Sequence, residues 1–428
     1  MLFPQLLPGL LLLLAPLAAA GPITGALNAS SPDALVPSWH GLPIVNPNAR
    51  GIIPGSYIVV YKDSYDDDAI AAKQAVFAAT IARRNLDRRD ATGTVLSTAV
   101  NSFRLGGMRA MAVQADDATI MDIDAADEVD FVEADTAVSH MAVFAQTNAP
   151  QGLVRLSNRD PGQGNYVFDE SAGEGVTAYV IDTGIRLSHS EFQGRATFGA
   201  NFINTNDTDE NGHGSHVAGI IGGATFGVAK KINLVSVKVL DADGAGSNSG
   251  VLKGMQFVVN DAQAKKIIGR AVMNMSLGGS HSAAVNKAIQ SMHSAGIPAI
   301  VAAGNEDQDT ADSSPGSAPE ALTVAAIDAA TDQRAYFSNF GAPVDVYAPG
   351  VSILSVGFTS DTATKVLSGT SMACPHITGL AAYLMTYRGV TDPDQLRTLI
   401  KNLAIKAGAT VQNNKANTTS LIANNGHL

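Results

Sequence analysis

The later part of the chain alternates between short apolar runs and longer stretches with helical spacing. The apolar runs lie at residues 176–181, 232–240, 271–277, 297–302 and 322–326. Helical stretches separate several of them, for example at 249–266 and 283–294. Apolar strands that alternate with helices are typical of a parallel sheet whose two faces are both covered. We therefore predict an α/β domain over residues 143–428, with three layers, α/β/α, around a mainly parallel sheet.

Residues 56–133 follow a different pattern, which we interpret as a separate α+β unit. A strand-like run at 56–61 precedes a helical stretch at 66–89, whose acidic start and arginine-rich end suit the helix dipole. Then follow strand-like runs near 95–103 and 109–114, a second helical stretch at 116–128 and a last strand at 129–133. The order β-α-β-β-α-β predicts a ferredoxin-like unit of about 80 residues, which we place at about 55–138.

The N-terminal segment has the features of a secretory signal peptide. A leucine-rich run ends in Ala18-Ala-Ala, the small-residue pattern of a cleavage site before Gly21. No Lys or Arg precedes this run, so a buried helix or a membrane anchor is the alternative. The run is too short and too interrupted by proline to span a bilayer. We expect residues 1–20 to be removed and the protein to be secreted, with a linker at 21–52 that carries a glycosylation sequon at Asn28.

Composition and charge limit the classes of function. With 46% apolar and 16% charged residues, the chain is globular. A single cysteine permits neither an intramolecular disulfide nor a cysteine-based zinc site. Residues 21–144 carry 9 basic and 16 acidic residues, and the rest of the chain carries 19 and 23. The later domain has no strong basic stripe, so we expect no nucleic-acid binding.

Three polar clusters stand where the carboxyl ends of strands are expected, the edge at which open α/β sheets gather their working groups. Asp182 ends an apolar run and could orient a histidine, or simply cap the next turn. His213 is flanked by glycines and opens a helix-like run, although a structural histidine would fit as well. Ser371 precedes a helix predicted at 373–385, with Pro375 in its first turn, and alone would be an N-cap.

Together the three residues predict a catalytic triad in the order Asp, His, Ser. The histidine would take the hydroxyl proton, the carboxylate would fix the tautomer, and Ser371 would attack a carbonyl. The only cysteine, Cys374, lies one helical turn further on and is expected to pack beneath the nucleophile, so that a mercurial would slow the reaction. A zinc site at His213 and His216 lacks further ligands, and we interpret His216 as structural.

The motifs around these residues resemble the three signatures of subtilisin-like serine proteases. They read Tyr-Val-Ile-Asp-Thr-Gly at 179–184, Asn-Gly-His-Gly-Ser-His-Val-Ala-Gly at 211–219 and Gly-Thr-Ser-Met-Ala-Cys-Pro-His at 369–376. Two further segments, at 146–153 and 274–279, resemble the secreted fungal, proteinase K-like branch. The resemblance covers about residues 55–428. It implies a subtilisin-like fold and a secreted serine endopeptidase that forms an acyl-enzyme.

The resemblance also assigns residues to substrate binding. Asn305, in Ala-Ala-Gly-Asn, would complete the oxyanion hole with the backbone N–H of Ser371. The edge that pairs with extended substrate would be Gly244, Ala245 and Gly246. The walls of the pocket for the residue before the scissile bond would be Ser276, Leu277, Gly278, Ala302, Ala303 and Gly304. Because these residues are small, we expect broad specificity with a preference for large apolar or aromatic side chains.

A calcium site is also implied by the resemblance. Its ligands would be the carbonyls of Pro319 and Ala321 and the carboxylate of Asp345, although Asp345 could be an ordinary turn residue. The chain departs from the branch elsewhere, because Val217 stands where a cysteine is frequent and the usual disulfides cannot form.

The β-α-β-β-α-β unit resembles the family's propeptide, so residues 21–142 would assist folding and then inhibit the enzyme as an intramolecular partner. Its tail, 132–140, would enter the active site as a strand, with autocleavage between His140 and Ala145. Protein and peptide substrates are the other partners we expect, for a monomer that binds no membrane. Sequons at Asn206 and Asn417 are expected to carry glycans, whereas the sequon at Asn274 is expected to be buried.

Three rival interpretations make different demands on the sequence. An α/β-hydrolase lipase or esterase needs G-x-S-x-G and the order Ser, Asp, His, and the chain has neither. A pseudoprotease acting as a binding protein needs a broken triad or oxyanion residue, whereas all four are present. The N-terminal unit could act as a protease inhibitor in its own right if it persisted after cleavage.

Overall fold

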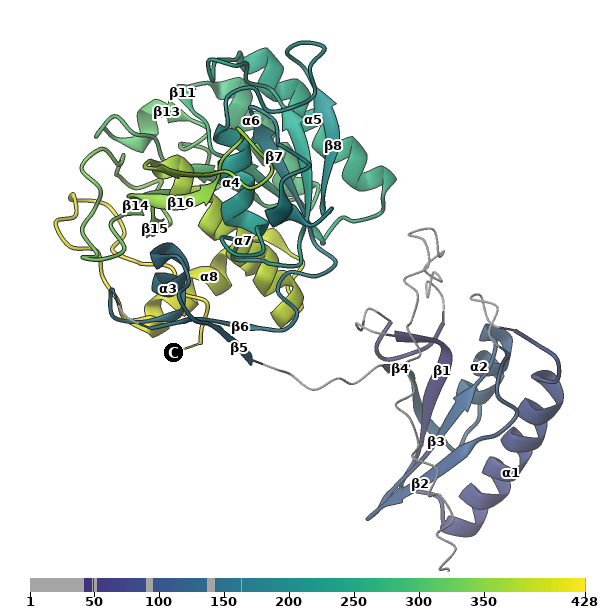
Figure 1. The fold of residues 1–428 in the computed structure, drawn as a ribbon. Coiled ribbons are helices and arrows are strands. Elements are labelled where there is room, and N and C mark those ends of the chain that lie inside the picture. The colour runs from purple at the N-terminus through teal and green to yellow at the C-terminus, as the bar shows by residue number, and fades with distance from the viewer. Residues whose placement is uncertain are drawn as a thin grey trace, which may run out of the picture. The chain divides into compact units, whose positions relative to one another are not determined.

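The computed structural model describes residues 42–47, 49, 52–89, 95–136, 143–162 and 164–427. The expected signal peptide at 1–20, the sequon at Asn28 and residues 140–142 of the expected cleavage segment lie outside this part of the chain. The chain divides between Val138 and Ser139 into two compact units, and each is described by itself (Figure 1). This division lies four residues before the domain boundary that we expect from the sequence.

The first unit contains four strands and two helices among its described residues. In chain order they are β1 (Ile52–Tyr61), α1 (Asp67–Arg84), β2 (Asn101–Leu105), β3 (Met108–Gln114), α2 (Asp117–Asp124) and β4 (Val129–Thr136). The strands form an antiparallel sheet in the order β2-β3-β1-β4. Each helix begins after a capping aspartate, since Asp66 accepts a hydrogen bond from the backbone of Ala69 and Asp116 from that of Thr119. β2 begins six residues later than the strand-like run suggests.

The second unit is built on a seven-stranded parallel sheet in the order β15-β14-β12-β10-β7-β9-β8. These strands are β7 (Thr177–Asp182), β8 (Ala196–Asn201), β9 (Asn233–Lys238), β10 (Ala271–Met275), β12 (Ala299–Ala302), β14 (Leu322–Ile327) and β15 (Val346–Pro349). The parallel α/β sheet that the sequence predicts is confirmed. The two edge strands, β8 and β15, were not predicted.

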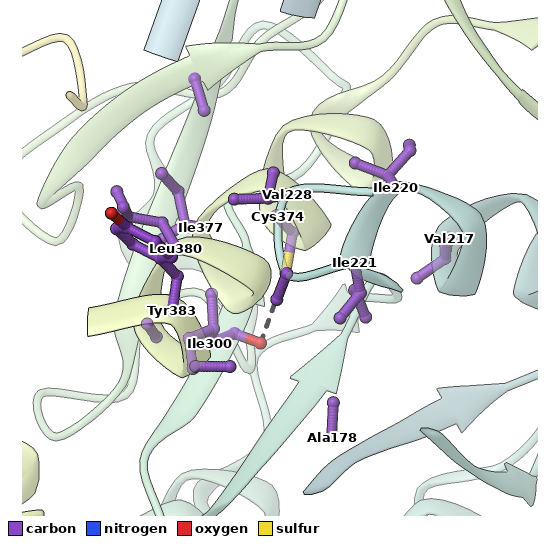
Figure 2. Packing of buried hydrophobic residues seen from close by; sticks show 14 of the residues in the cluster. Ala178, Val217, Ile220, Ile221, Val228, Ile300, Cys374, Ile377, Leu380 and Tyr383 are labelled. Carbon is purple, nitrogen blue, oxygen red and sulfur yellow. Dashed lines mark hydrogen bonds between the residues drawn. The ribbon is translucent and has the colours of Figure 1, made fainter. Parts of the chain in front are cut away.

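Helices cover both faces of this sheet, because successive side chains of each strand point to opposite sides. Ala178 and Val180 of β7 pack in a core with α4 (His213–Gly222) and α7 (Thr370–Arg388). Tyr179 and Ile181 of the same strand pack in a second core with α5 (Asn248–Ala264) and α6 (Ala283–Ser294). Figure 2 shows the first core, to which α4 contributes Val217, Ile220 and Ile221 and α7 contributes Cys374, Ile377 and Leu380.

The remaining elements are short or peripheral. They are β5 (Val143–Gln146), α3 (Gln151–Ser157), β6 (Tyr166–Asp169), β11 (Gly279–Ser280), β13 (Ser313–Ser314), β16 (Ile353–Val356), β17 (Thr364–Leu367), α8 (Pro393–Ala407) and two 3-10 turns, Ser190–Phe192 and Thr310–Asp312. Within the described residues, the helices are all too short or too polar to cross a membrane.

Candidate active site

Asp182 and His213 meet at the carboxyl edge of the parallel sheet. Asp182 is the last residue of β7 and is fully buried, and His213 is the first residue of α4. The Nδ1 atom of His213 lies 2.7 Å from Oδ1 of Asp182, an oxygen that also accepts a 2.8 Å hydrogen bond from the backbone N–H of Thr183. A carboxylate can only accept, so Nδ1 carries the proton and Nε2 is left as the basic nitrogen.

A second carboxylate, that of Asp209, holds the segments that carry Asp182 and His213 in place. Its Oδ1 accepts from the hydroxyl of Thr183 and from the backbone N–H of Gly212, and its Oδ2 accepts from the backbone and hydroxyl of Ser215. Asp209 is 4% exposed, so these bonds are shielded from water. It thereby joins the end of β7 to the start of α4. Sequence reasoning missed Asp209, although it lies only four residues before His213.

The end of β7 lies so close to the start of α4 that glycine is required on both sides of His213. Gly212 has φ of 99°, in the left-handed region that glycine enters at little cost. A Cβ atom on Gly214 would collide with the carbonyl oxygen of Gly184, which follows β7. Glycine at both positions lets the β7 end and the α4 start pack directly against each other.

The two histidines of α4 differ in their surroundings. Burial lowers the pKa of His213, but the carboxylate of Asp182, with help from Asp209, outweighs this and raises it overall. His216 is buried, and its Nε2 lies 3.1 and 3.0 Å from the carbonyl oxygens of Ile353 and Lys365. Burial lowers the pKa of His216 to about 4. These contacts fit the structural role predicted for His216, and of the two histidines only His213 has a raised pKa.

Ser371 lies in the first turn of α7, so the helix begins earlier than the predicted residue 373. Pro375 is consequently inside the helix and not in its first turn, and it has no N–H to donate to the carbonyl of Ser371. The hydroxyl of Ser276 donates to that carbonyl instead, at 2.9 Å. The hydroxyl of Ser371 in turn donates to the carbonyl of Ser276 at 3.1 Å. Two reciprocal hydrogen bonds therefore fix the start of α7 beside the end of β10.

His213 and Ser371 come from helices that pack against one another, α4 and α7 (Figure 1). They line two neighbouring hollows that share Leu277, Gly278 and Gly279. In the described part of the chain, Ser371 makes no hydrogen bond to His213, because its hydroxyl is directed to Ser276. Catalytic hydrogen bonds are often long without substrate and tighten when it binds.

Cys374 lies three residues after Ser371 on α7 and points into the packed interior. It is fully buried, and its Sγ donates to Oδ1 of Asn274 at 3.3 Å. The Sγ also donates to the carbonyl of Ile300 at 3.4 Å, the bond drawn in Figure 2. Burial raises the pKa of this thiol to about 12. A buried, protonated thiol is not a nucleophile, and the predicted position beneath Ser371 is confirmed.

Asn305 lies on the loop after β12, beside the start of α7. Its Oδ1 accepts from the backbone N–H of Thr370 at 2.8 Å and from the Thr370 hydroxyl at 2.9 Å. These two donors fix which end of the amide is oxygen, and so leave Nδ2 with its two protons to donate. The role of Thr370 was missed, because only the folded structure brings residues 65 apart in sequence together.

Every residue predicted to bind substrate lines one or both of the two hollows. The first, of about 550 Å³, is lined with His213 by Gly244, Ala245, Gly246, Ser276, Leu277 and Gly278. The second, of about 460 Å³, is lined with Ser371 and Asn305 by Leu277, Gly278, Ala302, Ala303 and Gly304. Both volumes are in the range of ligand pockets. Sequence reasoning missed the carboxylates of Glu306 and Asp312, which also line the second hollow.

Two of the three residues predicted to bind calcium are held by a cationic side chain. The carbonyl of Pro319 accepts a 2.7 Å hydrogen bond from Arg397, whose guanidinium also lies 2.8 Å from Oδ1 of Asp345. The third predicted ligand, Ala321, is fully buried. Within the described residues, no group of three or more His, Cys, Asp or Glu side chains could hold a metal ion.

The sequons within the described residues fall into two classes. Asn206 and Asn417 are exposed, and their side chains are accessible to a modifying enzyme. Asn274 is fully buried in β10, as the sequence predicts.

Comparisons with known proteins agree with this geometry. The subtilase family model matches residues 173–425. The chain is 43% identical over 385 residues to a protein named subtilisin-like protease 2 from Pseudogymnoascus destructans, covering 90% of this chain and 92% of that protein. It is 43% identical to alkaline protease 1 from Aspergillus flavus, covering 88% and 92%.

A solved structure described as a cold adapted subtilisin-like serine proteinase is 39% identical. It superimposes with a TM-score of 0.59, covering 66% of this chain and 99% of that structure. The family match spans more than half of the chain, and the relatives cover most of it. The chain therefore belongs to the subtilase family of serine endopeptidases.

Proposed function

We propose that the chain is a secreted endopeptidase, made as a zymogen, whose triad is Asp182, His213 and Ser371. The observation that carries the proposal is the 2.7 Å contact between His213 and the buried carboxylate of Asp182. The nucleophile Ser371 stands beside the same hollows, at the N-terminus of α7. In this arrangement Nε2 of His213 is the base that faces substrate.

The reaction would proceed through an acyl-enzyme. His213 takes the proton of the Ser371 hydroxyl as Oγ attacks the scissile carbonyl carbon, and Asp182 stabilises the imidazolium that forms. The imidazolium then gives its proton to the leaving amine. A water molecule, activated by the same imidazole, hydrolyses the ester and restores Ser371. Each proton that leaves the serine or the water is thus returned to a product or to the enzyme.

Two donors are suited to the oxyanion of the tetrahedral intermediates. One is Nδ2 of Asn305, oriented by Thr370. The other is the backbone N–H of Ser371, in the first turn of α7, where helical N–H groups have no partner within the helix. Loss of one such donor typically costs about 3–4 kcal/mol of transition-state stabilisation.

The small residues that line the second hollow support broad specificity, with a preference for a large apolar or aromatic side chain before the scissile bond. Leu277 and the alanines at 302 and 303 offer apolar surface, and Gly278 and Gly304 leave room. A panel of peptides that differ only at this position would measure the preference. Strict cleavage after Lys or Arg would contradict it.

The role of an inhibitory propeptide for the first unit is supported by the length of the matches. The 385 residues aligned with the Pseudogymnoascus protein exceed the second unit, Ser139–Leu428, so the relative shares part of the first unit as well. We propose that residues 1–20 direct secretion, that the chain cleaves itself between His140 and Ala145, and that Asn28, Asn206 and Asn417 accept glycans. The mature enzyme is proposed to act as a monomer.

Labelling with a fluorophosphonate tests the proposed function, because only an activated serine reacts with the probe. We expect the wild type to be labelled and to cleave itself, and Ser371→Ala to remain an unlabelled precursor. Cys374→Ala is the matched control on the same helix and should be labelled like the wild type. Equal labelling of the wild type and Ser371→Ala would contradict the assignment of the nucleophile, and normal processing of Ser371→Ala would contradict self-cleavage.

A further inference from the structure

The guanidinium of Arg397 lies among the oxygens that the sequence assigns to calcium. Its Nη1 donates to the carbonyl of Pro319 at 2.7 Å. Its Nε and Nη2 lie 2.9 and 2.8 Å from Oδ1 of Asp345. The Nζ of Lys401 reaches the same carboxylate oxygen at 3.3 Å. One carbonyl and one carboxylate oxygen are therefore already held by cationic donors.

The carboxylate of Asp345 is rigidly placed to receive these donors. Asp345 is 2% exposed and directly precedes β15. Its backbone N–H donates to the carbonyl of Thr323 at 2.9 Å, and its Oδ2 accepts from the backbone N–H of Thr323 at 3.1 Å. Asp345 is thus fixed to the amino end of the sheet by two hydrogen bonds to β14, and its other carboxylate oxygen, Oδ1, faces Arg397.

The cations come from one face of α8. Arg397 and Lys401 are four residues apart, one helical turn, so both side chains reach across to Asp345. Asp392 caps the start of this helix by accepting from the backbone of Gln395. The contacts of Arg397 therefore connect three segments: the helix α8, the Pro319 turn before β14, and Asp345 before β15.

The charges at this position disfavour a divalent ion. Calcium takes six to eight oxygen ligands, usually including more than one carboxylate. Among the described residues, Asp345 is the only acid that Arg397 and Lys401 contact, and those two side chains already bring two positive charges. A calcium ion at the same oxygens would lie beside both cations. The planar guanidinium, by contrast, matches a carboxylate and a carbonyl with separate N–H groups.

We propose that Arg397 takes the place of a calcium ion in this fold and makes the connection between α8 and the β14–β15 edge independent of calcium. The inference does not depend on the proposed function, because it concerns stability and is measured without substrate. In this proposal, the Arg397 side chain does the work of an exchangeable ion, and a chelator cannot remove it.

Thermal unfolding of the full chain, in a Ser371→Ala background that prevents autolysis, tests the proposal. The midpoint is measured in EDTA and in calcium chloride for this parent, for Asp345→Asn, for Arg397→Ala and for Arg397→Ala/Lys401→Ala. We expect the parent and Asp345→Asn to respond equally to calcium. In EDTA, Arg397→Ala should unfold about 5 °C below the parent. The double variant should gain a calcium-dependent rise that the parent lacks.

Arg186→Ala is the matched control. Arg186 is 31% exposed, against 30% for Arg397, and pairs with the more exposed carboxylate of Asp361. Its removal should lower the midpoint less and add no response to calcium. Arg397→Lys keeps the charge but cannot hold both oxygens, so its unfolding midpoint should lie between those of the parent and Arg397→Ala. It replaces Arg397→Ala in the comparison if the alanine variant does not fold.

Three results would overturn the proposal. A calcium response in the parent that disappears in Asp345→Asn would mean that the ion binds there despite Arg397. An unchanged midpoint of Arg397→Ala in EDTA would mean that the guanidinium does not support the fold. No calcium response in the double variant would mean that the oxygens do not suit the ion even when they are free.

Discussion

Two buried carboxylates at opposite edges of one parallel sheet show how the partner decides what an acid does. Asp182 ends β7 at the carboxyl edge, and Asp345 precedes β15 at the amino edge. Each accepts hydrogen bonds from a backbone N–H and from a nitrogen of a basic side chain. The partner of Asp182 is an imidazole, a group that can gain and lose a proton, whereas the partner of Asp345 is a guanidinium that always keeps its charge.

The difference follows from where the two acids lie in the sheet. At the carboxyl edge, loops spread apart and leave the hollows that His213 and Ser371 line. At the amino edge, α8 lies over Asp345 and the carboxylate serves only to hold segments together. Similar burial and similar hydrogen bonding thus suit the proposed proton transfer in one place and stability in the other.

Exchange of each acid for its amide should separate the two roles most strongly. We expect Asp182→Asn to lower kcat about 10⁴-fold, because the amide favours the wrong tautomer of His213, with little change in the unfolding midpoint. Asp345→Asn should lower the midpoint and leave kcat within a few fold. Steady-state kinetics and thermal unfolding of the mature enzymes measure both effects. If Asp345→Asn abolished activity in a folded protein, the comparison would fail.

The free energy of unfolding should fall in acid because of two buried histidines that, unlike His213, have no carboxylate partner among the described residues. Burial lowers the pKa values of His216 and His376 to about 4, so between pH 6.5 and 4 the unfolded chain binds protons that the folded chain does not. Stability is therefore present above pH 6.5 and lost as the pH falls, by about 3 kcal/mol for each histidine at pH 4.

Urea unfolding of the Ser371→Ala chain at pH 7, 5 and 4 measures this loss. His216→Gln should flatten the pH dependence, and replacing the exposed His281 by Gln is the control. For His213 the sign is opposite, because its pKa is raised: its contribution is present below pH 6.5 and disappears as the pH rises through the folded pKa. A pH dependence that His216→Gln leaves intact would refute the assignment for that residue.

Removal of the second carboxylate near His213 should have a smaller effect. Asp209 helps to raise the pKa of His213, and the base must be neutral to act. In Asp209→Asn the acidic limb of the kcat/KM profile should therefore move to lower pH. An acidic limb at the wild-type position would show that Asp209 acts only by joining β7 to α4.

The smallest effect is expected at the thiol. Cys374→Ala should change kcat/KM by no more than about twofold, because Sγ contacts only buried groups beneath the site. A mercurial can reach this buried thiol only when the segment opens locally; once formed, the bulky adduct should displace α7 and slow the wild type, and Cys374→Ala should be unaffected. The measurement is the rate before and after treatment. Equal rates in the treated and untreated wild type would contradict this prediction.

The sequence predicts the parallel sheet well and its edges poorly. The central strands are continuous apolar runs because helices cover both of their faces. β8 lies at one edge, is largely exposed or half-buried, and contains Gly199, so it lacks such a run. β15 is four residues long and ends in Pro349. β8 therefore lacks the apolar pattern that distinguishes a strand from a loop, and the proline of β15 argues against a strand.

The same limit applies to the candidate site. Asp182, His213 and Ser371 stand in long local motifs, so short-range sequence suffices to single them out. Thr370 and Arg397 act through partners that are distant in sequence, and Arg397 meets Pro319 from 78 residues away. In the sequence, an arginine on an amphipathic helix cannot be told from any other solvent-facing charge, because only the fold shows which oxygens it reaches. The calcium prediction therefore assigned the oxygens of Pro319 and Asp345 to an ion without taking Arg397 into account.

The reciprocal hydrogen bonds between Ser276 and Ser371 have a kinetic consequence. The hydroxyl of Ser371, the proposed nucleophile, donates to the carbonyl of Ser276, so it must turn before it can give its proton to His213, the proposed base. Rotation about a side-chain bond takes picoseconds to nanoseconds, whereas enzymes typically turn over in milliseconds to a second. The Ser371 hydroxyl can therefore break and re-form its hydrogen bond to Ser276 many times in each catalytic cycle, and this rotation does not limit the rate.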